Sequence, residues 1–241
     1  MDRTHSVGRG ADSGQERVDR EGDFRQIGLI RRRADLSMTQ FSDHWRTVHA
    51  RLGLAALTTA TAYVQYHRLV TDSPPPDLRP AGYDGMAVVW FATAAGAAAV
   101  AGNEQYRATV APDEPDFLDA HADNLVARGH VLTGADITQD RPQRAMVILL
   151  RGARGRVTAD DIAAALRDAD PALSRLEYAV PDISVDAESP YAVVISLWAD
   201  TTAGLLTAWQ QSSRCREQLH AMAAGEPLTA LLANPIRVRW T

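Results

Sequence analysis

The chain has 241 residues, of which 46% are hydrophobic, so it can bury a substantial core in one large domain or two ordinary ones. Its 25 basic residues are all arginines and face 30 acidic ones, and the resulting formal charge of −5 argues against nucleic acid as a partner. No apolar run reaches the roughly 18 residues of a membrane-spanning helix, and the single cysteine, Cys215, excludes an internal disulfide or a cysteine-based metal site.

The amino-terminal residues 1–22 are predicted to form a disordered leader. They are rich in Arg, Asp, Gly and Ser and lack the apolar segment of a signal peptide. With one cysteine and no targeting segment, the protein is expected to be cytoplasmic. Order begins at Phe24, where FRQIGLI is typical of a strand, and the three arginines at 31–33 then form a solvated corner.

An amphipathic helix comes next. Ser37 stands three residues before Gln40, which is a capping box. Apolar residues then recur at intervals of four, three and four, at Phe41, Trp45, Val48 and Leu52. His49 lies on the border of this apolar stripe, where it can point toward a cavity. His44 lies on the opposite border and is expected on the surface.

Polar side chains line one face of the following strand, TAYVQYHRLV. Tyr63, Gln65 and His67 alternate with Val64 and Tyr66. Because hydrogen-bonding groups are an odd choice for contact with helices, we expect the polar face to line a pocket in an otherwise apolar barrel.

The rest of the first half contains a loop, a buried strand and a helix. Residues 73–84, SPPPDLRPAGYD, are too rich in proline for regular structure. GMAVVWF is predicted to be a strand buried on both faces. Its start follows Asp84, whose carboxylate either caps a turn or orients a histidine. A helix is expected over 94–107, then a loop at APDEPDF and a terminal element near His130.

The second half repeats the same order of elements. A strand at 145–150 precedes a helix capped by Thr158 and Asp161, followed by strands at LEYAV and YAVVISLW. A helix over 209–219 and the strand IRVRW complete it. Strand, helix, strand, strand, helix, strand is the order of a ferredoxin-like unit, so the chain is predicted to be an α+β protein with two tandem ferredoxin-like repeats, at residues 23–140 and 141–241.

Equivalent positions support a duplication. One offset of 121 residues matches Phe41 with Ile162, Trp45 with Leu166 and His49 with Asp170, and an offset of 107 matches Phe91 with Trp198. A sheet covered on one face by helices still has a second face to bury. Pairing the two sheets would enclose that face, so the two repeats are expected to form a dimeric α+β barrel within one chain.

The residues suited to chemistry are histidines, tyrosines and one carboxylate, and no phosphate loop, zinc motif or nucleophile elbow is present. Histidine exchanges protons near neutral pH, so His49 is the candidate general acid or base, with His67 or Asp84 orienting it or handling a second proton. The candidate substrate-binding residues, which would hold a carbonyl or phenol or form apolar wall, are Tyr63, Gln65, Tyr106, Trp45 and Trp90.

The first half resembles the EthD family. The resemblance is carried by FRQIGLIRRRADLSMTQFSDHWRTVHA, YVQYH, YDGMAVVWF, EQYRA and APDEPDFLD, in that order over roughly residues 24–132. It implies a dimeric α+β barrel and relatives that include cofactor-independent isomerases, polyketide cyclases and dehydratases, and quinone-forming monooxygenases. The second half departs from the pattern at Ile162, Leu166 and Asp170, so one working site is expected.

The leading functional hypothesis is a cofactor-independent isomerase, cyclase or dehydratase acting on a cyclic, aromatic or polyketide-like small molecule, with no metal. The alternatives are a cofactor-free monooxygenase on a phenolic substrate and a non-catalytic protein that binds a hydrophobic metabolite. Haem binding through a histidine is a further possibility for the superfamily. The barrel needs no partner chain, so a monomer with a pseudo-twofold barrel and a homodimer both remain open.

Overall fold

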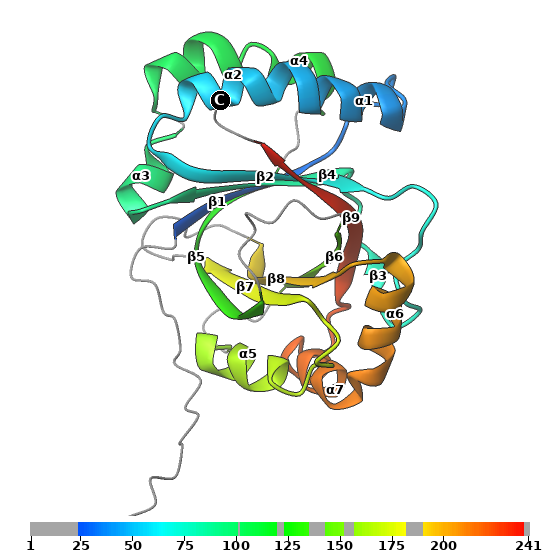
Figure 1. The fold of residues 1–241 in the computed structure, drawn as a ribbon. Helices are drawn as coiled ribbons and strands as arrows, with labels where there is room; N and C mark the ends of the chain where they lie inside the picture. Colours follow the sequence, from blue (N-terminus) through cyan, green and yellow to red (C-terminus); the bar gives the residue numbers. More distant parts are fainter. Residues whose placement is uncertain are drawn as a thin grey trace, which may run out of the picture.

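The structure is a computed structural model that describes residues 24–100, 102–119, 123–134, 143–151, 157–181 and 190–238. The expected leader and the expected boundary between the repeats, at residues 140 and 141, lie outside these ranges. Eight antiparallel strands close into a barrel, and one layer of helices covers it on each of two opposite sides (Figure 1). No helix in the described part of the chain is long and apolar enough to cross a membrane.

Each repeat supplies four strands in the ferredoxin-like order. In the first repeat the spatial order is β2-β4-β1-β5, and in the second it is β7-β8-β6-β9. The first-repeat strands are β1 (Phe24–Ile30), β2 (Ala60–Arg68), β4 (Gly85–Phe91) and β5 (Asp123–Gly134). The second-repeat strands are β6 (Arg144–Arg151), β7 (Arg175–Pro181), β8 (Tyr191–Ala199) and β9 (Thr229–Val238).

Two equivalent seams join the repeats. The last strand of each repeat pairs with the second strand of the other, β5 with β7 and β9 with β2, both antiparallel. The ring therefore has no free edge among these eight strands, and its inward faces are buried against one another. The predicted fold, two tandem ferredoxin-like repeats forming a barrel in one chain, is confirmed.

The helices pack outside the barrel, each layer on the sheet of its own repeat (Figure 1). The first layer consists of α1 (Met38–His44), η1 (Trp45–His49), α2 (Ala50–Ala56), α3 (Ala94–Ala98), η2 (Tyr106–Val110) and α4 (Glu114–Phe117). The second layer consists of α5 (Ala159–Leu166), α6 (Thr202–Gln211) and α7 (Ser213–Met222). Both predicted capping boxes, at Ser37 and Thr158, are present.

Four predicted elements were wrong in detail. The helix expected over 94–107 is broken, because Asn103 Oδ1 accepts from the Tyr106 amide and starts a new turn. The expected loop at 111–117 contains α4, with Pro115 in its first turn, where proline is tolerated. The helix expected over 209–219 is two helices that meet at Ser212. The proline-rich loop contains a short strand, β3 (Arg79–Pro80), parallel to β9.

Matched contacts relate the two repeats and correct one offset. Thr93 and Thr201 cap α3 and α6 by accepting from Gly96 and Gly204, and each pair is 108 residues apart. The same offset matches Trp90, not Phe91, with Trp198, and both tryptophans belong to the core inside the barrel. Phe91 belongs to the core under the first helical layer.

A symmetric pair of stacked contacts sits where the two repeats meet. The guanidinium of Arg31 lies 4.8 Å from the ring centroid of Tyr83. In the second repeat the guanidinium of Arg151 lies 4.7 Å from the ring centroid of Tyr191. The two tyrosine hydroxyls hydrogen-bond to each other across the repeats. The arginines are 120 residues apart, within one residue of the offset of 121, and the tyrosines are 108 apart, the same offset as the two tryptophans.

Candidate functional site

The polar face of β2 points toward the helices, not into the barrel. Val64 and Tyr66 belong to the core inside the barrel, whereas Tyr63 belongs to the core under the first helical layer. Period two places Gln65 and His67 on the side of Tyr63. The expectation that this face lines the barrel interior was therefore wrong, because the helix supplies hydrogen-bonding partners that the strand pattern alone does not reveal.

A chain of hydrogen bonds connects this face to α1 and η1. Ser42 Oγ lies 2.6 Å from His67 Nδ1, and His67 Nε2 lies 3.1 Å from Gln65 Oε1. Gln65 Nε2 then donates to the carbonyl oxygen of Trp45 at 3.0 Å and to the hydroxyl of Tyr63 at 2.9 Å. The His67 ring also packs against the Trp45 indole, with centroids 4.4 Å apart. Four of the predicted site residues are thus brought together.

His49 belongs to a second group, built around Asp113. His49 Nδ1 lies 2.9 Å from one carboxylate oxygen of Asp113, and His44 Nε2 lies 2.9 Å from the other. The Phe117 ring packs against both imidazoles, at centroid distances of 4.7 Å and 5.0 Å. His44 is therefore part of the cluster and not a bare surface residue as expected.

The orientation of His49 leaves one nitrogen for chemistry. Because Asp113 accepts at Nδ1, that nitrogen carries the proton and Nε2 carries the lone pair. Nε2 makes no hydrogen bond to a described residue, and the His49 side chain as a whole is 11% exposed. This is the arrangement of an oriented general base.

Burial keeps both central histidines neutral. It lowers the pKa of His49 below its ordinary value, although Asp113 opposes the shift. It lowers the pKa of His67 to about 4, and the nearby Arg46 adds to the effect. Each ring therefore holds one lone pair at neutral pH and can accept a proton.

The two phenols in this region remain protonated. Burial raises the pKa of Tyr63 to about 12. Burial, and then the hydrogen bond to Glu114, raise the pKa of Tyr106, whose hydroxyl donates to that carboxylate. Tyr63 is buried and accepts from Gln65, so that bond does not use its own O–H proton.

Two π-helical segments carry several of these residues. In the first, the Ala50 amide bonds to the carbonyl of Trp45, and in the second the Ala111 amide bonds to that of Tyr106. Such segments occur often at functional sites, because the extra residue in the turn changes the direction in which side chains leave the helix. Trp45 and His49 lie at the two ends of the first segment and are both buried.

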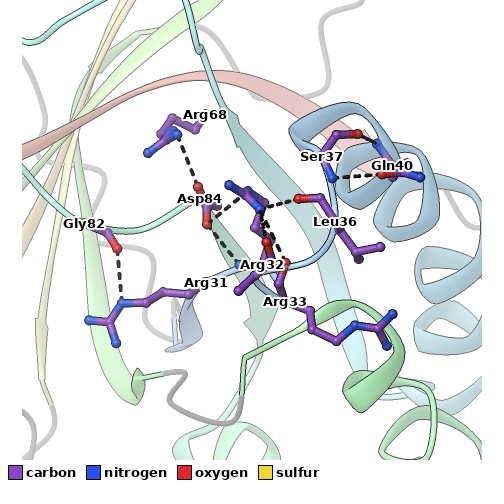
Figure 2. Close-up of polar contacts among 10 residues, drawn as sticks. Arg31, Arg32, Arg33, Leu36, Ser37, Gln40, Arg68, Gly82 and Asp84 are labelled. Carbon is purple, nitrogen blue, oxygen red and sulfur yellow. Dashed lines mark hydrogen bonds and ion pairs between the residues drawn. The ribbon is translucent and has the colours of Figure 1, made fainter.

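Asp84 immediately precedes β4, where its side chain contacts the turn between β1 and α1, and it does not orient a histidine. Its carboxylate accepts from the Arg32 backbone amide at 3.0 Å and lies 3.4 Å from Arg68 Nη2 (Figure 2). In the same corner Arg31 donates to the carbonyl of Gly82. The turn interpretation of Asp84 is the one the structure supports, and the arginine corner bonds to the loop as well as contacting solvent.

Trp90 is separated from the candidate site by the sheet. It faces the barrel interior, where the guanidinium of Arg25 lies 5.2 Å from its ring centroid. Arg25 Nη1 lies 3.3 Å from Glu177, which also receives the hydroxyl of Tyr66 at 3.2 Å. Trp90 can therefore not form a wall beside His49.

Sequence reasoning missed Asp113, Ser42 and the charged residues inside the barrel. Asp113 stands 64 residues from His49, and nothing local in APDEPDF selects it as a partner. Arg25 does have a sequence signal, because it is a charged residue in β1 on the same face as the apolar Ile27 and Leu29. Among the described residues, no group of three or more His, Cys, Asp or Glu side chains could hold a metal ion. Cys215 is buried, and burial raises its pKa to about 12.

Comparison with known proteins agrees with this fold. Residues 33–121 match the model of the EthD domain. A solved structure described as an anthrone oxidase-like protein superposes with a TM-score of 0.58 at 8% identity, over 92% of this chain and 95% of that one. A search of curated proteins found no match.

Two further solved structures are provisionally described as monooxygenases. That from Fusobacterium nucleatum has a TM-score of 0.53 at 4% identity and covers 91% of this chain and 94% of its own. That from Lactobacillus acidophilus has a TM-score of 0.50 at 8% identity and covers 91% and 95%. At these identities the likeness shows a shared fold.

Proposed function

We propose, from the EthD domain that residues 33–121 form, that this protein is a cofactor-free oxygenase of phenolic, anthrone-like small molecules. One observation carries the proposal: His49 is held by Asp113 at Nδ1 while Nε2 stays without a partner among the described residues. A base of this kind makes a substrate anion, and an electron-rich anion can react with oxygen directly.

The chemistry balances without an external reductant. His49 Nε2 takes a proton from a ring CH₂ or its enol, and the anion adds O₂. Loss of water then leaves a carbonyl, so that one oxygen atom enters the substrate and the other leaves as water with the two hydrogens. Tyr63, whose own O–H proton is not used in the bond from Gln65, would stabilise the negative oxygen of the anion. The description of one structural neighbour as anthrone oxidase-like is compatible with this substrate class.

The same residues also suit isomerisation, cyclisation or dehydration. A neutral His49 can return the proton it takes, and the protonated Tyr63 can polarise a carbonyl. This second candidate needs no oxygen. The two are therefore distinguished by whether product forms at the expense of O₂.

The test is oxygen uptake by the purified protein with a hydroxylated anthrone. We expect uptake equal to the quinone formed, and a loss of at least about 10²-fold in His49→Ala, the range for removing a general base. His220→Ala is the matched control, because His220 also lies near an aspartate, 3.6 Å from Asp77, in the second repeat. Product without oxygen uptake would favour the second candidate, and tight binding without any product would contradict both.

A further inference from the structure

The hydrogen-bond chain that ends at Ser42 has a fixed direction. The carbonyl of Trp45 can only accept, so the nitrogen of the Gln65 amide must face it and Gln65 Oε1 must face His67. His67 Nε2 therefore carries the proton and donates it to Gln65. His67 Nδ1 is left with the lone pair and accepts the Ser42 hydroxyl at 2.6 Å.

Ser42, His67 and Gln65 thus stand as nucleophile, base and orienting group. This is the arrangement that activates a serine, with the base in hydrogen-bond reach of the hydroxyl and itself held by a third residue. Gln65 and His67 are 0% and 5% exposed, so both are held rigidly, whereas Ser42 is partly exposed and can meet a ligand. We infer that Ser42 is a nucleophile and that the protein can cleave activated esters through an acyl-serine.

The step is balanced within these residues. Ser42 Oγ attacks the ester carbonyl carbon and its proton passes to His67 Nδ1. The C–O bond to the leaving alcohol breaks, and the alcohol takes that proton. Water then attacks the acyl-serine, giving its proton to His67, and the carboxylic acid leaves as Ser42 recovers its proton. This activity is separate from proton transfer at His49 and does not depend on it.

The second repeat shows that the fold does not require this trio. At the offset of 121 residues, Ala163 stands where Ser42 stands, and it is buried in the second helical core. On β7 the residues facing the helices include Leu176 and Tyr178, which belong to the same core. An apolar interface therefore serves equally well for packing, which favours a chemical role for the polar trio in the first repeat.

The experiment is labelling of the full chain with a fluorophosphonate, read by intact mass and peptide mapping. We expect one adduct, on Ser42, absent in Ser42→Ala and at least 10-fold slower in His67→Ala, with hydrolysis of p-nitrophenyl acetate falling in parallel. Ser213→Ala, at an exposed serine of α7, should be labelled like the unmodified protein. A folded protein that takes no label, or labelling that survives Ser42→Ala, would overturn the inference.

A second variant covers the case in which Ser42→Ala or His67→Ala fails to fold. Ser42→Cys keeps the size of the side chain, and its thiol beside His67 should be alkylated by iodoacetamide at neutral pH. Cys215 provides the internal reference, since it is 1% exposed and should react far more slowly. Reaction at position 42 no faster than at Cys215 would also overturn the inference.

Discussion

Asp113 accepts hydrogen bonds from two imidazoles, one on each carboxylate oxygen, and so connects the helix of His44 and His49 to the segment before α4. Its charge opposes the fall in the pKa of His49 that burial causes. The carboxylate therefore has two effects: it selects the tautomer of His49 and it keeps that ring a stronger base.

Asp113→Asn should lower kcat for oxygen uptake by about 10²-fold, because the amide can no longer fix the tautomer through a charge. It should also move the acidic limb of the kcat/KM profile to lower pH, because the pKa of His49 falls further when the negative charge is lost. Steady-state rates between pH 5 and 9 measure both effects. An acidic limb that moves to higher pH would contradict the assigned role.

His67 makes a pH-dependent contribution to stability. Its pKa in the folded protein is about 4, below the ordinary value near 6.5, so folding favours the neutral ring. The contribution is fully present above pH 6.5 and is lost as pH falls toward 4. The facing charges are Arg46, which lowers the pKa, and Asp43, which raises it.

Between pH 7.5 and pH 4.5 the protein should therefore lose about 2–3 kcal/mol more unfolding free energy than His67→Gln, at 1.36 kcal/mol per pKa unit. Urea unfolding at the two pH values measures the difference. Equal losses in the protein and in His67→Gln would show that His67 does not titrate as described.

The sequence predicts proximity for site residues that are close along the chain, but not for those that are far apart. Tyr63, Gln65 and His67 share a face because a strand has period two, and that inference needs no tertiary information. The bonds from Ser42 to His67 and from Asp113 to His49 join segments 25 and 64 residues apart. Only the docked helices set those distances.

At the scale of elements, periodicity predicts the two faces of a strand but not which of them looks inward. The pattern of β2 predicts that its polar residues face the barrel interior, whereas that interior holds Tyr66 and the pair Arg25 and Glu177. Aligning the two repeats one residue out of register also assigns a side chain to the wrong face of the sheet. Matching Trp198 with Phe91 pairs an inward-facing residue with one that faces the helices, whereas Trp90 faces inward like Trp198. Both errors concern which side of the sheet a residue faces, and neither changes the predicted strands.

Two glycines show how tightly the first helix lies on the sheet. A Cβ at Gly53, in α2, would lie 3.7 Å from Tyr63 Cε1, which is ordinary contact. A Cβ at Gly85, at the start of β4, would lie 2.5 Å from the Trp45 ring and 3.0 Å from the carbonyl of Tyr66. The second glycine is therefore required for the indole to reach its place, and the first is not.

Gly53→Ala should stabilise the protein by about 0.5–1 kcal/mol, because alanine loses less backbone entropy in a helix. Gly85→Ala should destabilise it by about 1–3 kcal/mol, because Trp45 must shift. Urea unfolding measures both, and each variant is the control for the other. Destabilisation by Gly53→Ala would mean that the helix packs closer to Tyr63 than described.

At the scale of the molecule, the proline-rich loop of the first repeat packs against the helices of the second repeat. Leu78 is buried in the second helical core. Asp77 accepts from Trp209 Nε1 at 3.3 Å and from Arg216 Nη1 at 3.4 Å. Together with the two seams, these contacts join the two repeats into one folding unit.

Leu78→Ala should cost about 2–4 kcal/mol, as for other buried leucines, and unfolding should stay a single transition. Val70→Ala is the control in the same connecting segment, since Val70 is 65% exposed and should change stability by less than about 0.5 kcal/mol. Fluorescence and far-UV circular dichroism should give coincident urea curves. Separate transitions would show that the repeats fold independently.

The architecture as a whole can be predicted from the sequence. Two βαββαβ repeats give two sheets that are each covered by helices on one face, and packing the sheets together buries the other face of both. The location of the site cannot be predicted in this way, because the outer face of one sheet and the inner face of the barrel have similar apolar composition. The difference is made by helices that place Ser42 and Trp45 over the polar strand face and His49 beside Asp113.

The most direct measurement is a crystal structure of the protein with a phenolic ligand bound. We expect the ligand to lie between the first helical layer and the outer face of β2, with an oxygen within hydrogen-bond distance of His49 Nε2 and the hydroxyl of Tyr63. A ligand inside the barrel, against Trp90 and Arg25, would contradict the proposed site.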